Sequence, residues 1–329
     1  MSEPRDHHFL PQFYLRLWED ERGEVYGYRR PAAGRPIAPP RRYPPAGIGY
    51  LRDLYAIPAA DPASKQVLER RVMAPIDNDA ARALEAILSV GGKPRELKLA
   101  YAWARFLLAL VVRTPRQMEW MAESLRSHDE QELIRPDDQA VLLADTAEAE
   151  ARGRAELLIR FSSSGWLIRY MAAMPWSVLE LPEGAEHFVT GDDPLLISNG
   201  IGQADSFLML PIGPRRLFIA AGCKDVIFDF AWQCARLGPS INDAIVRQSD
   251  DLVVADRRDL LSFVQQRIQT GAEDGVSGLN RRTWRALGTY RGRDPHLEYV
   301  QLLANRPGKS PPPASSALAL LWRHPRGWL

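Results

Sequence analysis

Cysteine, long apolar runs and an excess of charge of one sign are all scarce in this sequence of 329 residues. Its two cysteines, Cys223 and Cys234, are too few for the disulfide-rich scaffold of a small secreted protein. The longest apolar stretch, Leu99 to Val112, is interrupted by Arg105 and is short for a membrane span, which needs about 20 residues. Lys and Arg total 42 against 41 for Asp and Glu, so no overall field selects a polyanionic partner.

The composition that remains is typical of a folded protein. Hydrophobic residues make up 46% and charged residues 25% of the chain, which excludes a mainly disordered protein. The opening residues, MSEPRDHH, contain no apolar segment of the kind that a secretory signal requires. We therefore expect a soluble, cytoplasmic protein without a membrane partner.

Helical patterns dominate the first 174 residues. Apolar residues recur every three or four positions from Ser64 to Leu88, and Pro75 is expected to kink or split that helix. The nearly all-apolar segment from about Glu96 to Val112 predicts a buried helix. Further helices are expected over 116–127 and 137–160.

Proline dominates residues 31–49 and predicts an extended or loop segment rather than a helix. Arg35, Arg41 and Arg42 make this segment basic. It is therefore the local patch through which the protein could contact a nucleic-acid backbone.

Short strand patterns begin near Pro175 and predict a mostly antiparallel sheet. Strands are expected at 176–181, 187–190, 195–198, 207–210, 217–221 and 252–255. Helices are expected from about 240 to 248 and from 257 to 268. The fold class is α+β, with a mainly helical N-terminal half packed on a smaller, mostly antiparallel sheet. We expect a single domain over 1–304 (helical part about 1–174, sheet-containing part about 175–270) and a Pro/Ser-rich tail over 305–329.

The common catalytic signatures are missing. The sequence has no Walker-type phosphate loop, no CxxC pair, no HExxH and no Gly-x-Ser-x-Gly elbow. Gly200-Ile201-Gly202 is not followed by the helix that a dinucleotide fingerprint needs. Candidate chemistry therefore rests on individual polar residues.

His7 and His8 are the first candidates, because imidazole is a good metal ligand. The alternative is an exposed pair, or a buried histidine bonded to a carbonyl group. Glu69 and Asp77 lie eight positions apart on the helix that Pro75 interrupts. Two carboxylates near one imidazole would suit Mg²⁺ or Mn²⁺, whereas a solvated helix face explains the same acids.

Arg105 and Arg113 lie in or next to the apolar helix, where an unpaired guanidinium is costly. Arg113 and Thr114, at a helix break, could present a charge and a hydroxyl group to a phosphate. A structural salt bridge to Glu69 or Asp192 would explain the arginines equally well.

The segment Thr190-Gly191-Asp192-Asp193-Pro194 follows an expected strand. Carboxylates at strand ends often act as metal ligands or general bases, because the sheet holds them rigidly. A plain turn requires the same residue types. Asn242 could contact a substrate or cap a helix that Ser240 begins.

These elements occur together in an order that resembles a widespread, mostly bacterial family, the domain of unknown function DUF4238. The similar segments are His7 to Arg16, 53–55, Glu69 with Asp77, 113–115, 188–194, 211–214 and 241–242. The resemblance spans about residues 7 to 255. It implies no established reaction.

Two hypotheses follow from these residues. The first is a metal-dependent phosphodiester hydrolase, such as a nuclease, that uses Mg²⁺ or Mn²⁺ to activate water. Its metal ligands would be His7, His8, Glu69, Asp77 and Asp192. Its catalytic residues would be Glu69, Arg113, Asp192 and Asp193, and its substrate contacts Arg105, Arg113, Thr114 and Asn242. The second is a non-catalytic binding protein, in which the same residues form a buried structural network.

Overall fold

The structure is a computed structural model, and it describes residues 5–31, 37–57, 66–119, 151–198 and 204–268. Within the fourth range, residues 152, 156–157 and 160–161 are excepted. Arg35, the glycines near 200, most of the helical segment expected over 137–160 and the expected tail lie outside the described residues. No helix in the described ranges is long and apolar enough to cross a bilayer.

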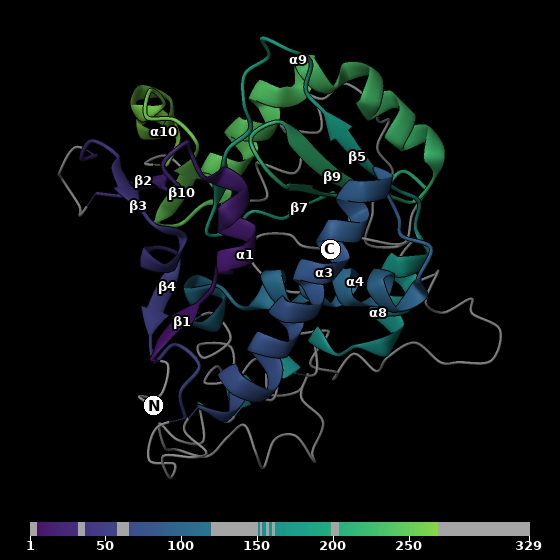
Figure 1. The fold of residues 1–329 in the computed structure, drawn as a ribbon, viewed down its shortest axis with the longest axis horizontal. Coiled ribbons are helices and arrows are strands. Elements are labelled where there is room, and N and C mark those ends of the chain that lie inside the picture. The colour runs from purple at the N-terminus through teal and green to yellow at the C-terminus, as the bar shows by residue number, and fades with distance from the viewer. Residues whose placement is uncertain are drawn as a thin grey trace, which may run out of the picture.

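Three helices form the lower layer of the molecule (Figure 1). They are α3 (Ala74–Val90), α4 (Leu97–Val112) and α8 (Gly165–Ala173). The α3 helix ends at Gly91, whose φ of 67° is in the left-handed region that glycine adopts without strain. Pro75 lies in the first turn of α3, where the type of helix changes but the chain stays helical, so the interruption expected at this proline is a change of helical geometry. The chain before it forms a π-helix, η3 (Glu69–Met73).

Antiparallel strands from the C-terminal half form one sheet with the order β5-β9-β8-β7. Its strands are β5 (Trp176–Glu180), β7 (Leu196–Ile197), β8 (Phe207–Pro211) and β9 (Arg216–Ala221). All five residues of β8 are buried, because the strand is central and covered on both faces. The predicted α+β fold with antiparallel strands is confirmed.

A second sheet joins the two ends of the described chain in the order β3-β2-β10-β6. Its strands are β2 (Val25–Arg29), β3 (Arg41–Tyr43), β6 (Thr190–Gly191) and β10 (Leu252–Ala255). A separate ribbon pairs β1 (Asp6–His8) with β4 (Tyr50–Arg52). The mainly helical N-terminal half thus also contains strands, and its proline-rich segment contains both β3 and a short 3₁₀ turn, η2 (Pro45–Gly47).

The largest departure from the expected elements is α9 (Lys224–Gln248). The sequence predicts a helix only after Ser240, but α9 begins 16 residues earlier and continues through Pro239. It packs on β5, β6 and β9, and also on α10 (Leu261–Ile268). Its apolar face binds to the sheet strongly enough to outweigh the hydrogen bond that proline removes.

The N-terminal segment lies across both layers. It contains α1 (Gln12–Leu15) and the 3₁₀ turn η1 (Arg16–Trp18). Tyr14 is fully buried, donates to the Pro211 carbonyl at 2.7 Å and contacts the Thr190 hydroxyl at 2.6 Å. One phenol group therefore ties α1 to β6 and β8, so the segment that begins the family resemblance is part of the core.

Candidate functional site

The candidate residues separate into two groups at the C-terminal end of α4. Four of them gather around a buried ion pair: His8, Glu69, Asp77 and Arg113. Three others line a pocket: Thr114, Asp192 and Asp193. The remaining three contact other parts of the fold: His7, Arg105 and Asn242.

His7 is completely buried in β1, and both of its ring nitrogens are used. Its Nδ1 accepts the backbone N–H of Tyr55 at 2.8 Å, which requires the proton on Nε2, 2.5 Å from Gln66 Oε1. The ring also stacks on Tyr55, with the centroids 5.4 Å apart. His7 therefore holds β1 to the chain after β4, and it does not have a free nitrogen for the metal ion that the sequence suggested.

Arg113 follows the last residue of α4 and is fully buried. Its two Nη atoms donate to the Asp77 carboxylate at 2.7 and 3.0 Å, and Nη2 also donates to the His8 carbonyl at 2.7 Å. Burial lowers the pKa of Arg113, but the Asp77 charge raises it further, so the net pKa is above its ordinary value. The guanidinium is thus part of an internal ion pair rather than the expected clamp on a phosphate.

Two polar groups beside this ion pair are buried without a hydrogen-bond partner in the described part of the chain. They are His8 Nε2 and Glu69 Oε2. Burial raises the pKa of Glu69 to about 7, because the Arg113 charge only partly offsets the loss of water. Burial likewise lowers the pKa of His8. Near pH 7, His8 is therefore mainly neutral, whereas Glu69 is about half ionised.

The described residues contain no group of three or more His, Cys, Asp and Glu side chains that could hold a metal ion. His7 is saturated, Asp77 is bound to Arg113, and Asp192 lies in the other group. The five expected ligands are therefore not brought together around one ion.

Asp192 anchors the turn after β6. Its Oδ1 accepts the backbone N–H of Asp250 at 2.8 Å, and its Oδ2 accepts those of Asp251 at 2.7 Å and Leu252 at 3.1 Å. Burial raises the pKa of Asp192 to about 7, while these backbone donors lower it. The carboxylate ties β6 to the link between α9 and β10.

Gly191 makes this close approach possible. A Cβ atom at this position would lie 1.9 Å from Ser249 Oγ and 2.9 Å from the Leu252 carbonyl. Glycine is therefore required by packing, and the Gly-Asp pair does more than form the plain turn that was the alternative interpretation.

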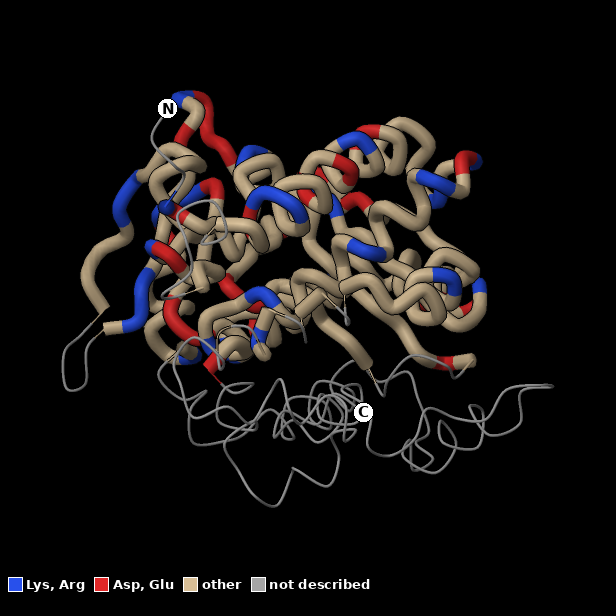
Figure 2. Tube along the Cα trace, turned by 90° about the horizontal axis from the view of Figure 1, so that it is seen from below, with Lys and Arg blue, Asp and Glu red and all other residues tan. Residues whose placement is uncertain are grey.

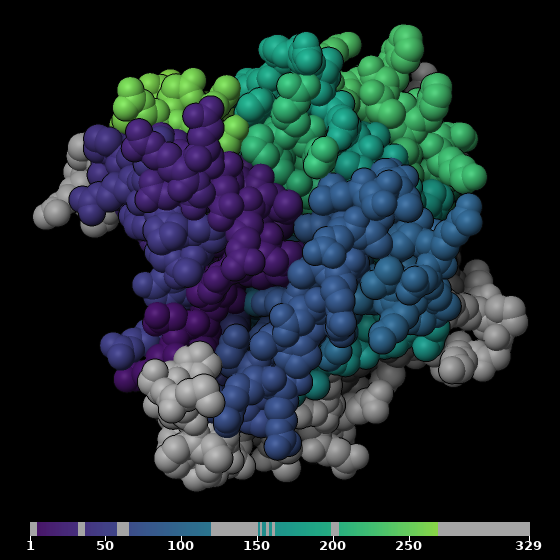
Figure 3. Space-filling view, viewed as in Figure 1, coloured from purple at the N-terminus to yellow at the C-terminus, as the bar shows by residue number. Residues whose placement is uncertain are grey.

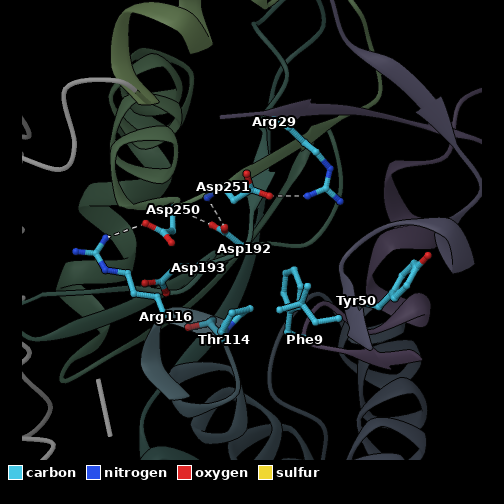
Figure 4. Close-up of a pocket in the computed structure, with 11 residues that line it drawn as sticks. Phe9, Arg29, Tyr50, Thr114, Arg116, Asp192, Asp193, Asp250 and Asp251 are labelled. Atoms are coloured by element: carbon cyan, nitrogen blue, oxygen red, sulfur yellow. Dashed lines mark hydrogen bonds and ion pairs between the residues drawn. The ribbon is translucent and has the colours of Figure 1, made fainter. Parts of the chain in front are cut away.

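The pocket lies between the end of α4, β6 and the start of β10, and its volume is about 110 Å³ (Figure 4). Four aspartates and two arginines provide its charge: Asp192, Asp193, Asp250, Asp251, Arg29 and Arg116. Phe9, Tyr50, Leu51 and Pro115 provide apolar wall. A cavity of this size holds several waters or the head group of a small ligand.

The two arginines of the pocket are each paired with an aspartate. Arg116 lies 3.4 Å from Asp250, and Arg29 lies 2.5 Å from Asp251. Figure 4 shows both ion pairs beside the Asp192 carboxylate. The pocket lining thus contains four acids and two bases, and Arg30, outside the lining, also lies 3.5 Å from Asp250.

The other expected substrate contacts have structural partners. Arg105 donates to Ser163 Oγ at 3.2 Å, at the turn before α8. Asn242 lies inside α9 rather than at its start, accepts from the Val189 N–H and donates to the His187 carbonyl, both at 2.9 Å. Thr114 accepts the Gln117 N–H at 3.2 Å and caps a new helical turn, although it also lines the pocket.

Arg42, one of the two described arginines of the expected nucleic-acid patch, is paired with acidic residues. Arg42 pairs with Asp20 at 2.9 Å, lies 3.8 Å from Glu24 and contacts the Tyr26 ring. Figure 2 shows basic and acidic residues interspersed over the described chain rather than gathered on single-sign faces. Binding to nucleic acid remains a prediction that these contacts do not support.

Sequence reasoning missed most of the pocket. Arg29, Arg116 and the adjacent pair Asp250-Asp251 come from three separate places in the sequence, and only the Asp-Asp pair after a helix offers a local signal. That signal has the same form as Asp192-Asp193, namely two acids beside a strand of the same sheet.

Comparison with known proteins identifies a family but no function. No curated protein and no solved structure matches the chain significantly. The family described as "Protein of unknown function (DUF4238)" matches residues 6–259, which is well over half of the chain. That range contains both groups of candidate residues. The expected resemblance is therefore confirmed, and the chain belongs to the DUF4238 family of proteins of unknown function.

Proposed function

We propose that the protein binds a small organic cation in the acidic pocket, with the charged group of the ligand against the aspartates. The observation that carries this proposal is the composition of the pocket wall, in which four carboxylates face two guanidinium groups. A cation beside these carboxylates in a partly desolvated site would be attracted more strongly than it is in water.

Two of the four pocket acids lie at the turn after β6. Arg116 and Arg29 are each balanced by one aspartate from the start of β10. Asp192 and Asp193 supply the two further acids, and each is only 5% exposed. A cation that enters the pocket therefore meets acids that the protein holds away from bulk solvent.

The apolar wall indicates the rest of the ligand. Phe9 and Tyr50 come from the N-terminal segment and lie across the hollow from the aspartates (Figure 4). Aromatic faces attract cations and also pack against apolar groups. An aromatic or aliphatic amine can place its charge beside the aspartates and its apolar part against Phe9 and Tyr50. A phosphate ester would place its negative charge next to four acids.

The buried polar residues form the frame of this pocket. Arg113 bonds to the carbonyl of His8, next to Phe9, and Asp192 bonds to the backbone of Asp250 and Asp251. Each contact fixes a segment that lines the hollow. This favours the second hypothesis, a binding protein in which the candidate residues form a structural network.

Thermal unfolding with phenethylamine tests the proposal, with phenethyl alcohol as the neutral ligand of similar shape. A ligand that binds only the folded state raises stability by about 2.7 kcal/mol at one hundred times its Kd. We expect stabilisation by the amine alone, and tighter binding as pH rises through about 7, because Asp192 then loses its proton. Equal shifts with the amine and the alcohol would contradict the proposal.

A matched pair of variants locates the site. Asp193→Asn removes one charge from the pocket wall at nearly constant volume and should weaken amine binding roughly tenfold. Asp79→Asn removes an exposed charge of α3 outside the pocket and should leave binding unchanged. An unchanged amine affinity in Asp193→Asn would also contradict the proposal.

A metal-dependent phosphodiester hydrolase is the second candidate function. It is favoured by the oxygen ligands that Mg²⁺ or Mn²⁺ prefers, which line the same cavity as two arginines. The described side chains do not converge on one ion, so this candidate needs the carboxylates to rearrange. The hydrolase would be favoured if Mn²⁺ raised the Tm, EDTA reversed that rise and phenethylamine left the Tm unchanged.

A further inference from the structure

The outer surface of α9 carries the two most exposed large aromatic residues in the described part of the chain. Phe228 is 71% exposed and Trp232 is 84% exposed. They are four residues apart and therefore lie on one face of the helix, one turn from each other. Isolated apolar residues are common on protein surfaces, but two adjacent aromatic side chains indicate a contact surface.

The opposite face of α9 packs against the core of the protein. Val226, Phe230, Cys234 and Leu237 are buried on it, and α9 packs through that face on β5 and β9. Figure 1 shows α9 along the outer edge of the molecule, and Figure 3 shows green side chains of this region standing out from the surface at the upper right. The aromatic pair thus faces away from the core that anchors the helix.

The charges on this outer face are arranged by sign along the helix. Asp225 and Asp229 are exposed on the N-terminal side of Trp232, and Arg236 is exposed on its C-terminal side. At 100° per residue, all three lie within about 60° of Trp232 around the axis. None of them forms an ion pair with another residue of the described chain.

We infer that this face of α9 binds the same face of a second copy of the chain, with the two helices antiparallel about a two-fold axis near Trp232. Asp229 lies three residues before Trp232 and Arg236 lies four residues after it. Antiparallel pairing therefore places Asp229 of each copy opposite Arg236 of the other. The surface is self-complementary, as a two-fold interface requires.

The aromatic side chains supply the apolar centre of this contact. Phe228 and Trp232 from both copies would be buried together, and the charged pairs would form the rim. The contact involves one helix from each copy and is smaller than a standard interface of about 1,600 Å², so the dimer is weak and depends on concentration. It does not depend on the proposed ligand pocket.

Sedimentation velocity of the full chain from about 1 to about 200 µM tests the inference, since weak dimers associate in that range. The wild type should shift from monomer towards dimer as concentration rises. Trp232→Ala should weaken association at least tenfold, as expected for an interface hot spot. Leu97→Ala removes an exposed apolar residue of α4 and should not change association.

Charge reversal gives a sharper test. In a dimer of Arg236→Asp, the new aspartate of each copy lies opposite Asp229 of the other. In a dimer of the double variant Asp225→Arg/Asp229→Arg, the new arginine at position 229 lies opposite Arg236. Each variant alone should associate more weakly than the wild type. An equimolar mixture should associate again, because the acids of one chain then oppose the bases of the other.

A wild type that remains monomeric at the highest concentration would overturn the inference and leave the face to a different partner. A mixture that associates no better than its components would overturn the antiparallel arrangement. High salt should reduce the differences between these variants, because it screens exposed charges. A normal unfolding curve for each variant confirms that the chain has folded.

Discussion

Arg113 and Asp77 form a bidentate ion pair that joins α4 to α3 inside the protein. The side chain of Arg113 is 1% exposed and that of Asp77 is 19% exposed. The same guanidinium donates to the His8 carbonyl, which attaches the N-terminal strand to both helices. The pair therefore holds together three segments that are far apart in the sequence.

Asp77→Ala should destabilise the protein strongly. It would leave the Arg113 guanidinium buried without its carboxylate, a situation that typically costs about 3–5 kcal/mol. Urea unfolding followed by fluorescence measures the loss in free energy of unfolding. Asp77→Asn keeps an oxygen acceptor and should cost less than Asp77→Ala.

The exposed pair of Asp79 and Arg82 on α3 is the control for this prediction. Exposed ion pairs contribute about 1 kcal/mol or less, because water screens both charges. Asp79→Ala should therefore change stability only slightly. Similar losses in Asp77→Ala and Asp79→Ala would show that the buried pair has no special role.

Glu69 should make stability fall as pH rises. Burial raises the pKa of Glu69 from 4.5 to about 7, so the folded state binds this proton more tightly than the unfolded state. The stabilisation is complete below about pH 4.5 and is lost as pH rises to about 7. Its upper limit is about 3 kcal/mol, and Glu69→Gln should remove this part of the pH profile.

The measurement compares unfolding of Glu69→Gln with that of the wild type at several pH values. The advantage of the variant should grow between pH 4.5 and about 7 and then level off. Glu85→Gln changes an exposed glutamate of α3 and serves as the control. Parallel pH profiles for Glu69→Gln and the wild type would contradict the prediction.

Gly191→Ala should destabilise the pocket and the whole protein. Its Cβ would overlap Ser249 Oγ and press on the Leu252 carbonyl, so β6 would have to move from β10. Overpacking of this kind costs about 1–3 kcal/mol. Differential scanning calorimetry should show a lower Tm.

Gly238→Ala is the matched glycine substitution. Gly238 lies within α9, and an added Cβ would meet its nearest atom, of Leu181, at an ordinary 3.8 Å. Alanine favours a helix over glycine by about 1 kcal/mol, which opposes the crowding between a new Cβ and the ring of Pro239, so this variant should lower the Tm less than Gly191→Ala does. A lower Tm in Gly238→Ala than in Gly191→Ala would contradict the packing argument.

Elements with a strong local pattern could be predicted from the sequence. The α4 helix is apolar on nearly every side, and it begins and ends within one residue of the predicted bounds. The β8 and β9 strands are short apolar runs on either side of a Gly-Pro turn, and their observed bounds also agree with the predicted ones. In these segments local preference and tertiary packing favour the same structure.

The first half of α9 could not be predicted in this way. Phe228 and Trp232 are exposed in this half, and charged residues lie between its aromatic residues, so the apolar pattern is irregular. Pro239, further along the helix, also argues against a helix that continues through it. The helix forms because Val226 and Phe230 find a sheet surface to cover. That surface is built from strands remote in the sequence, and tertiary packing outweighs a weak local preference.

The candidate residues were partly identified by the sequence, because polar residues are rare in apolar surroundings and must have partners there. Arg113 and Asp77 were both among the candidates, and the sequence left a structural salt bridge open for Arg113. It could not identify Asp77 as the partner, because Glu69 and Asp192 are equally acidic. The choice depends on the relative positions of α3, α4 and β6.

The sequence alone determined the α+β class, the buried α4 helix and the membership of the DUF4238 family. Only the tertiary structure decided that His7 is saturated, that Arg113 is turned inward and that the open pocket belongs to Asp192, Asp193, Asp250 and Asp251. The reason is physical. Periodicity and residue type set local structure, whereas the use of a hydrogen-bonding atom depends on which distant group comes to lie within about 3 Å of it.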